Sequence, residues 1–231
     1  MTQSGRQLVL DLPHRSALGQ ADFIVSASNE SAVRQVDAWP NWPQPALVVA
    51  GPAGSGKTHL VNVWRQQAGA AIVAAAVLDE AAAAGLADAK AVAVEDADRG
   101  IGSERALFHL MNLTREQGLN LLVTGRAPPG EWTIALPDLR SRLRACPVAV
   151  LGEPDENLLL AVLVKLLDDR QLPATPAAVA YLARHLDRSM AAAIGVVEAL
   201  DRLLWDKPSE ITREVARRAL AAIGKDAGVD V

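Results

Sequence analysis

Three glycines, a lysine and a threonine between residues 51 and 58 have the types and the spacing that phosphate binding requires. The stretch GPAGSGKT places four residues between Gly51 and Gly56, and Lys57 and Thr58 follow at once. Glycines let a loop turn its backbone N–H groups onto phosphate oxygens, lysine reaches the β- and γ-phosphates, and the threonine hydroxyl suits Mg²⁺. An apolar run precedes this loop and an amphipathic segment follows it, as phosphate loops require. The residues expected to bind the nucleotide here are Gly51, Pro52, Ala53, Gly54, Ser55, Gly56, Lys57, Thr58 and His59.

Two further apolar runs end in groups that could act on a phosphate. The run AVAVED, residues 91–96, closes with Glu95 and Asp96. Carboxylates at the C-terminal end of a strand lie in the crevice where open α/β sheets bind ligands. One can hold Mg²⁺, which we assign to Glu95 together with Thr58, and the other can orient an attacking water. The run at 120–124 ends in Thr124, whose hydroxyl could touch the γ-phosphate or position water, and Arg126 beyond it could pair with Asp96 or with phosphate.

The hydrophobic pattern predicts the elements that must position these groups. Short apolar runs alternate with helical segments up to residue 151, which indicates a mainly parallel sheet with helices on both faces. The expected strands are Ala46–Ala50, Ala71–Val77, Ala89–Val94, Asn120–Thr124 and Pro147–Leu151, and the expected helices between them are Lys57–Gln67, Asp79–Ala87, Ser103–Gln117 and Pro137–Ala145.

After Pro154 the strand pattern stops and four helices are expected. They are Glu156–Arg170, Pro176–His185, Ser189–Trp205 and Glu210–Ile223. The chain therefore divides into a flexible leader at 1–20, an α/β nucleotide-binding domain at 21–153, a helical domain at 154–224 and a short tail at 225–231.

Composition narrows the class of protein. The chain has 231 residues, of which 50% are hydrophobic and 22% charged, so a disordered chain is excluded. A single cysteine, Cys146, excludes an intrachain disulfide. The net charge of −4 argues against a large DNA-phosphate-binding face. No apolar run reaches the roughly 18 residues of a membrane span, and no signal-peptide pattern opens the chain, so we expect a cytoplasmic protein.

The phosphate loop, the carboxylate strand and the threonine strand, in this order, resemble the AAA+ ATPases, and more narrowly the DnaA-related family with its Hda-type regulators of DnaA inactivation. The resemblance extends from residue 7 to about residue 220. It implies a P-loop NTPase fold with a five-stranded parallel sheet and a small all-helical lid domain, which binds ADP or ATP with Mg²⁺. The resemblance places Phe23, Ile24, Val25 and Asn29 beside the adenine.

The same resemblance assigns two arginines. The segment LPDLRSRLRAC, residues 136–146, is similar to the segment that carries the family's arginine finger, and the matching residue is Arg142. Residues 185–203 are similar to the sensor II helix, in which Arg188 would reach the nucleotide phosphates. Glu95 stands where many AAA+ proteins have aspartate, so turnover of the chain's own nucleotide is expected to be weak.

The leader contains the alternating stretch QLVLDL, residues 7–12, followed by a proline. It resembles the short peptide by which bacterial proteins bind the DNA polymerase sliding clamp. In that interpretation an extended segment presents leucines to an apolar pocket and the glutamine offers amide hydrogen bonds. The six residues alone are equally compatible with a first strand of the sheet. The clamp-binding residues would be Gln7, Leu8, Leu10 and Leu12.

The resemblance implies a negative regulator of bacterial replication initiation. Bound to the DNA-loaded clamp, it would stimulate ATP hydrolysis by DnaA in trans through Arg142 and leave inactive DnaA-ADP. No sequence-specific DNA reader is expected in the chain, and a homodimer is compatible with the pattern. Two alternatives stay open. One is an autonomous AAA+ ATPase, such as a helicase loader or a transposition helper, that uses Glu95, Asp96 and Thr124 on its own ATP. The other is a clamp-bound scaffold that does not stimulate hydrolysis.

Overall fold

The computed structural model describes residues 14–15, 23–205 and 209–226. The expected clamp peptide, with Gln7, Leu8, Leu10 and Leu12, lies outside these residues. The chain forms two compact units, one containing Ala27–Glu153 and the other containing Pro154–Val231 together with Ile24–Ser26. Two short strands, β1 (His14–Arg15) and β2 (Phe23–Ile24), pair with each other. The sequence pattern did not predict either of them.

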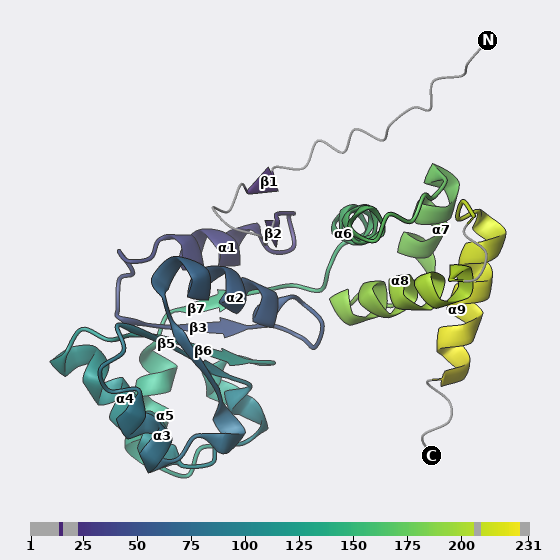
Figure 1. Cartoon of the computed structure of the whole chain (residues 1–231). Coiled ribbons are helices and arrows are strands. Elements are labelled where there is room, and N and C mark those ends of the chain that lie inside the picture. The colour runs from purple at the N-terminus through teal and green to yellow at the C-terminus, as the bar shows by residue number, and fades with distance from the viewer. Residues whose placement is uncertain (1–13, 16–22, 206–208, 227–231) are drawn as a thin grey trace. The chain divides into compact units, whose positions relative to one another are not determined.

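A five-stranded parallel sheet forms the first unit, as the sequence predicted (Figure 1). Its strands lie in the order β4-β5-β6-β3-β7. Their bounds are β3 (Ala46–Ala50), β4 (Ala71–Ala74), β5 (Ala91–Glu95), β6 (Asn120–Gly125) and β7 (Val148–Val150).

The strand expected at 71–77 is shorter than predicted. Its last three residues form the 3₁₀ turn η1 (Ala75–Val77). The carbonyl of Ala75 accepts the N–H groups of Leu78 at 3.2 Å and Gly102 at 2.9 Å. These two bonds end the ladder after Ala74, which an apolar run alone could not reveal.

Helices cover both faces of the sheet (Figure 1). On one face lie α1 (Glu30–Asp37), which the sequence did not predict, and α2 (Lys57–Ala68). On the other lie α3 (Glu80–Gly85), α4 (Glu104–Glu116) and α5 (Pro137–Ala145), with the 3₁₀ turns η2 (Ala97–Arg99) and η3 (Pro129–Glu131) in the connections. Side chains alternate between the two faces, so Val94 and Val123 share a buried core with Leu107, Trp132 and Leu139 of the α3–α5 side.

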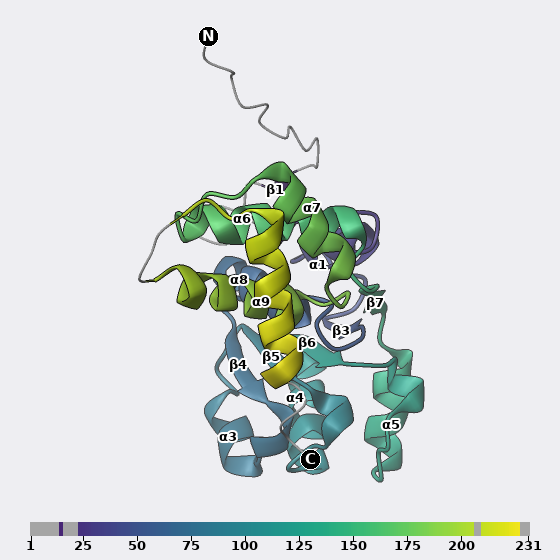
Figure 2. The ribbon, with the colours of Figure 1, turned by 90° about the vertical axis from the view of Figure 1, so that its right-hand side faces the viewer.

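Four helices form the second unit, as predicted: α6 (Glu156–Asp169), α7 (Pro176–His185), α8 (Met190–Leu204) and α9 (Arg213–Asp226). A capping residue precedes each of α6, α7 and α8, and its side chain accepts the backbone N–H of the residue three positions later. The capping residues are Asp155, Thr175 and Ser189. The last helix packs against α7 and α8 (Figure 2). It starts at Arg213 and not at Glu210, because Ile211 forms a parallel bridge with Ala174. No helix in the described ranges is long and apolar enough to cross a membrane.

Replacing Gly125 with alanine should lower thermal stability. A Cβ at this position would lie 2.5 Å from Cζ2 of Trp132, whose ring is buried and whose Nε1 donates to the carbonyl of Ala127 at 2.6 Å. Overpacking of this kind costs about 1–3 kcal/mol, which is a few degrees in melting temperature for a domain of this size. Gly130→Ala is the matched control because its Cβ would meet nothing within 4 Å. Equal melting temperatures for the two variants in a calorimetric scan would contradict the prediction.

Candidate nucleotide-binding site

The phosphate loop connects the end of β3 to the start of α2 in a conformation that its glycines make possible. Gly54 and Gly56 have φ values of 74° and 97°, in the left-handed region that glycine adopts without strain. A Cβ on Gly51 would lie 2.5 Å from the carbonyl oxygen of Leu151. No side chain caps the N-terminus of α2, and its first turn holds no acidic residue. The free N–H groups and the positive end of the helix therefore favour an anion at this loop.

Lys57 lies folded onto the same loop. Its side chain is largely buried, and Nζ donates to the carbonyls of Gly51 at 2.7 Å and Pro52 at 2.9 Å. Burial lowers the pKa of this ammonium below its usual value, and the charge of Arg126 lowers it as well, whereas the carboxylates of Asp96 and Asp98 oppose the shift. The lysine is thus held at the loop, where both the nearby carboxylates and the nearby arginine act on its charge.

Glu95 is on the phosphate-loop side of the sheet. Val92 and Val94 belong to the core on the α3–α5 side, so alternation along β5 directs Glu95 to the other face, which α2 covers. Its Oε1 is buried without a hydrogen-bond partner in the described part of the chain, and so is Oγ of Ser55 in the loop. Such orphaned polar atoms cost about 1–3 kcal/mol each. Their presence here indicates that a polar ligand completes the site.

The residues present fit a magnesium nucleotide. A carboxylate and a hydroxyl, from Glu95 and Thr58, are oxygen ligands of the kind that Mg²⁺ prefers. Within the described ranges no group of three histidine, cysteine or acidic side chains could hold a metal by itself.

Thr124 fixes the backbone at the other carboxylate. Its buried Oγ1 accepts the N–H of Asp96 at 3.0 Å, and Asp96 has a left-handed φ of 58°. The Asp96 carboxylate pairs with Arg99 at 3.6 Å, with both side chains about half exposed. The sequence left two partners open for Arg126, namely Asp96 and a phosphate. Because Asp96 already pairs with Arg99, the structure favours the phosphate. The hydroxyl proton of Thr124 remains able to donate to a water or a phosphate.

Asp98 is a candidate site residue that sequence reasoning missed. Its Oδ1 is buried without a hydrogen-bond partner in the described residues, and its negative charge raises the pKa of Lys57. The repeat of acidic residues in EDAD was the available signal. It was not sufficient, because a residue in the loop beyond a strand can point toward the site or away from it.

The residues expected near the adenine lie in different parts of the structure. Phe23 is buried and stacks on His59, with ring centroids 5.2 Å apart and planes 14° from parallel. Ile24 packs against Leu158 and Ala161 in the helical unit. Val25 is half-buried, and Asn29 is buried at the N-cap position of α1. The structure thus brings Phe23 and His59 together beside the start of α2.

Arg142 lies on α5 and is held against α4. Its Nη1 donates to Oδ1 of Asn112 at 2.6 Å, and its guanidinium carbon lies 4.5 Å from the centre of the Phe108 ring. Leu139 and Leu143 anchor the helix on the core, whereas Arg140 is exposed. Arg188 is exposed immediately before the N-cap of α8. Its expected reach to the nucleotide stays a prediction.

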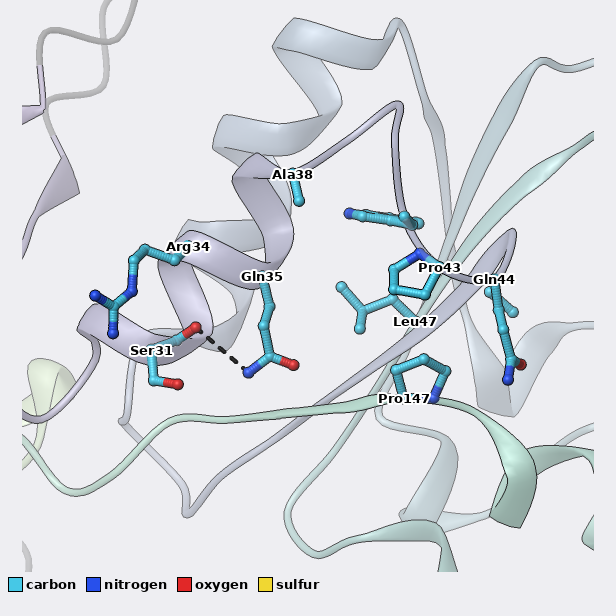
Figure 3. Close-up of a pocket in the computed structure, with 10 residues that line it drawn as sticks. Ser31, Arg34, Gln35, Ala38, Pro43, Gln44, Leu47 and Pro147 are labelled. Carbon is cyan, nitrogen blue, oxygen red and sulfur yellow. Dashed lines mark hydrogen bonds between the residues drawn. The ribbon is translucent and has the colours of Figure 1, made fainter.

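A cavity of about 290 Å³ lies between α1 and the start of β3 (Figure 3). Trp42, Pro43 and Pro147 line it, and Gln35 at its rim donates to the carbonyl of Ser31 at 3.4 Å. The phosphate loop begins at the opposite, carboxyl end of β3. The cavity is therefore not part of the nucleotide site.

Comparison with known proteins identifies the fold. No protein-family model matches the sequence, and neither does any curated protein. Among solved structures, domain III of the Thermotoga maritima replication initiation protein DnaA superposes with a TM-score of 0.75 at 18% identity, covering 87% of this chain and 94% of that one. A replication initiator DnaA bound to AMPPCP and single-stranded DNA superposes with a TM-score of 0.67 at 18% identity, covering 81% of this chain and 64% of that one. A point mutant of Thermotoga maritima RuvB superposes with a TM-score of 0.70 at 17% identity, covering 88% of this chain and 72% of that one. The chain has the AAA+ fold of these proteins.

Lys57→Ala should weaken the binding of both ADP and ATP. The substitution removes charge-assisted hydrogen bonds to phosphate while the loop backbone persists, and such bonds contribute about 1.5–3 kcal/mol, or roughly 10- to 150-fold in affinity. Isothermal titration calorimetry measures the change. Arg65→Ala, which removes an exposed charge from the same helix, is the control. Unchanged affinity in Lys57→Ala would remove the basis for a nucleotide site at this loop.

Proposed function

We propose that this chain is a negative regulator of bacterial replication initiation, of the Hda type, which acts on DnaA. It binds ADP or ATP at its own phosphate loop and uses Arg142 to stimulate ATP hydrolysis by DnaA. The product is inactive DnaA-ADP. The observation that carries the proposal is the position of Arg142, a guanidinium held by two neighbouring side chains on the face of the sheet opposite α2.

The contacts of Arg142 suit a residue that acts on a partner's nucleotide. The guanidinium has five N–H donors, and the bond to Asn112 uses one of them. Stacking on Phe108 holds its plane. Such restraint reduces the entropy lost when the side chain contacts a phosphate. A cation near a transferring γ-phosphoryl group stabilises the charge that develops there, as arginine fingers do in trans.

The chain's own nucleotide has a structural or regulatory role in this proposal. Lys57 and the loop glycines bind the phosphates, and Thr58 with Glu95 holds Mg²⁺, which when bound neutralises phosphate charge. Phe23 and His59 offer stacked rings at the start of α2. Glu95 is one methylene longer than aspartate, so we expect weak hydrolysis by this site.

The leader would tether the protein to DNA through the sliding clamp. Leucines two residues apart on an extended chain project to the same side, which lets Leu10 and Leu12 enter one apolar pocket. Gln7 would supply the polar end of the contact. The partners of the proposed regulator are thus DnaA and the clamp, with no sequence-specific DNA contact of its own.

An autonomous ATPase is the second candidate function. The Asp96 backbone fixed by Thr124 and the unpartnered Oε1 of Glu95 support it, because both carboxylates lie at the end of the strand beside the phosphate loop, where a water and Mg²⁺ would be held. ATP turnover in the absence of DnaA, lost on Glu95→Gln, would support this candidate. The proposed regulator instead requires DnaA for rapid hydrolysis.

Arg142→Ala should keep its fold and its nucleotide but fail to stimulate DnaA. Loss of an arginine finger typically reduces the stimulated rate by about 10³–10⁵-fold. The measurement is release of labelled inorganic phosphate from DnaA loaded with γ-labelled ATP, with and without DNA-loaded clamp. Arg140→Ala removes an exposed arginine from the same helix and should stimulate like the unmodified protein. Full stimulation by Arg142→Ala would refute the trans-acting role, and with intact clamp binding it would favour a scaffold.

Replacing Gln7, Leu10 and Leu12 together with alanine should abolish clamp binding and leave the melting temperature nearly unchanged. If this stretch binds the clamp and not the core, its replacement should change the free energy of unfolding little. Surface plasmon resonance on immobilised clamp and a thermal melt measure the two effects. A strand that belongs to the sheet predicts the reverse, namely intact clamp binding and a melting temperature several degrees lower.

A further inference from the structure

Arg126 follows the last residue of β6, next to the point where β6 pairs with the start of the phosphate loop. Leu121 and Val123 face the core that contains Trp132, and the missing side chain of Gly125 faces Trp132 as well. Because side chains alternate along a strand, Thr124 leaves the backbone on the opposite face. That face carries α2 and the carboxylate of Glu95. Arg126 lies in the bend just after the strand, and its charge acts on Lys57 of the phosphate loop.

The backbone at Arg126 is fixed next to the first glycine of the loop. Ala50 and Gly125 are register partners in the β3–β6 pair, and the N–H of Gly51 donates to the carbonyl of Gly125 at 3.1 Å. On the other side, Ala127 is held through its carbonyl by Trp132. The side chain of Arg126 is nevertheless exposed. A fixed backbone with an exposed cation is the arrangement expected of a residue that meets a ligand.

The other cations described around this site already have partners. Lys57 donates to two loop carbonyls, and Arg99 pairs with Asp96. Arg126 has no hydrogen bond or ion pair within the ranges that the structure describes. Its charge nevertheless acts on Lys57, since it lowers the pKa of that ammonium in addition to the larger effect of burial. An anion bound beside both cations would relieve the repulsion between them.

We propose that Arg126 binds the terminal phosphates of the nucleotide held by the phosphate loop. This proposal rests on the nucleotide binding in the proposed function and adds a specificity-determining residue to it. A guanidinium beside the loop offers a planar, permanently charged fork for the β-phosphate of a nucleoside diphosphate or the β- and γ-phosphates of a triphosphate. A nucleoside monophosphate has no β- or γ-phosphate for the guanidinium to contact. The contribution of a side-chain cation persists when Mg²⁺ is removed.

The test is isothermal titration calorimetry of the full chain with ADP and AMP, each with Mg²⁺ and with EDTA. Arg126→Ala and Arg126→Gln should weaken ADP binding about tenfold or more, by a similar factor in both media, because a charge-assisted contact is lost. AMP affinity should not change. Arg126→Lys should retain part of the ADP affinity. Arg99→Ala is the control, since it removes an equal charge from the same neighbourhood.

The outcomes separate this proposal from the one on which it rests. Loss of ADP affinity with unchanged AMP affinity supports a terminal-phosphate contact. Unchanged ADP affinity in both Arg126 variants, an equal loss for ADP and AMP, or an equal loss in Arg99→Ala overturns it while the nucleotide site stands. Failure of the unmodified chain to bind ADP overturns the nucleotide site and this inference together. A thermal melt of each variant excludes unfolding as the cause of any loss.

Discussion

The register between β3 and β6 in the middle of the sheet is the constraint on which the rest of the site depends. It places Val49 beside Thr124 and Ala50 beside Gly125, and it lets Gly51 donate to the carbonyl of Gly125. A slip of one residue would exchange the two faces of a strand. Thr124 would then enter the core of the α3–α5 side, and its bond to Asp96 would be lost. The buried valines and leucines on both faces of the strands oppose that slip, because it would break the packing on each side.

The strands of the sheet and the four helices of the second unit were predictable because their signals are local. Strands buried on both faces are continuous apolar runs, and helices α6, α7 and α8 have capping residues one position before they begin. The errors occur where tertiary contacts decide. Ala75 ends its strand through a bond to Gly102, and α9 begins late because Ile211 pairs with Ala174. Neither partner is near in sequence.

The site shows the same division between local and tertiary information. The phosphate loop could be recognised from spacing alone, since its glycines and lysine must lie within one short stretch of chain to surround a phosphate. The bond between Asn112 and Arg142 spans 30 residues, and the orphaned oxygen of Asp98 depends on how its loop folds. Side chains that complete a site from separate elements become visible only when the sheet brings those elements together.

The location of Arg142 has a consequence for control. The contacts that hold this side chain come from α4 and α5, which cover the face of the sheet opposite the phosphate-loop helix. The residues that hold the guanidinium are therefore different from those of the phosphate loop. In the proposed role, we therefore expect the activity of the regulator to depend mainly on whether it meets its target. A tether to one place in the cell would decide how often that happens.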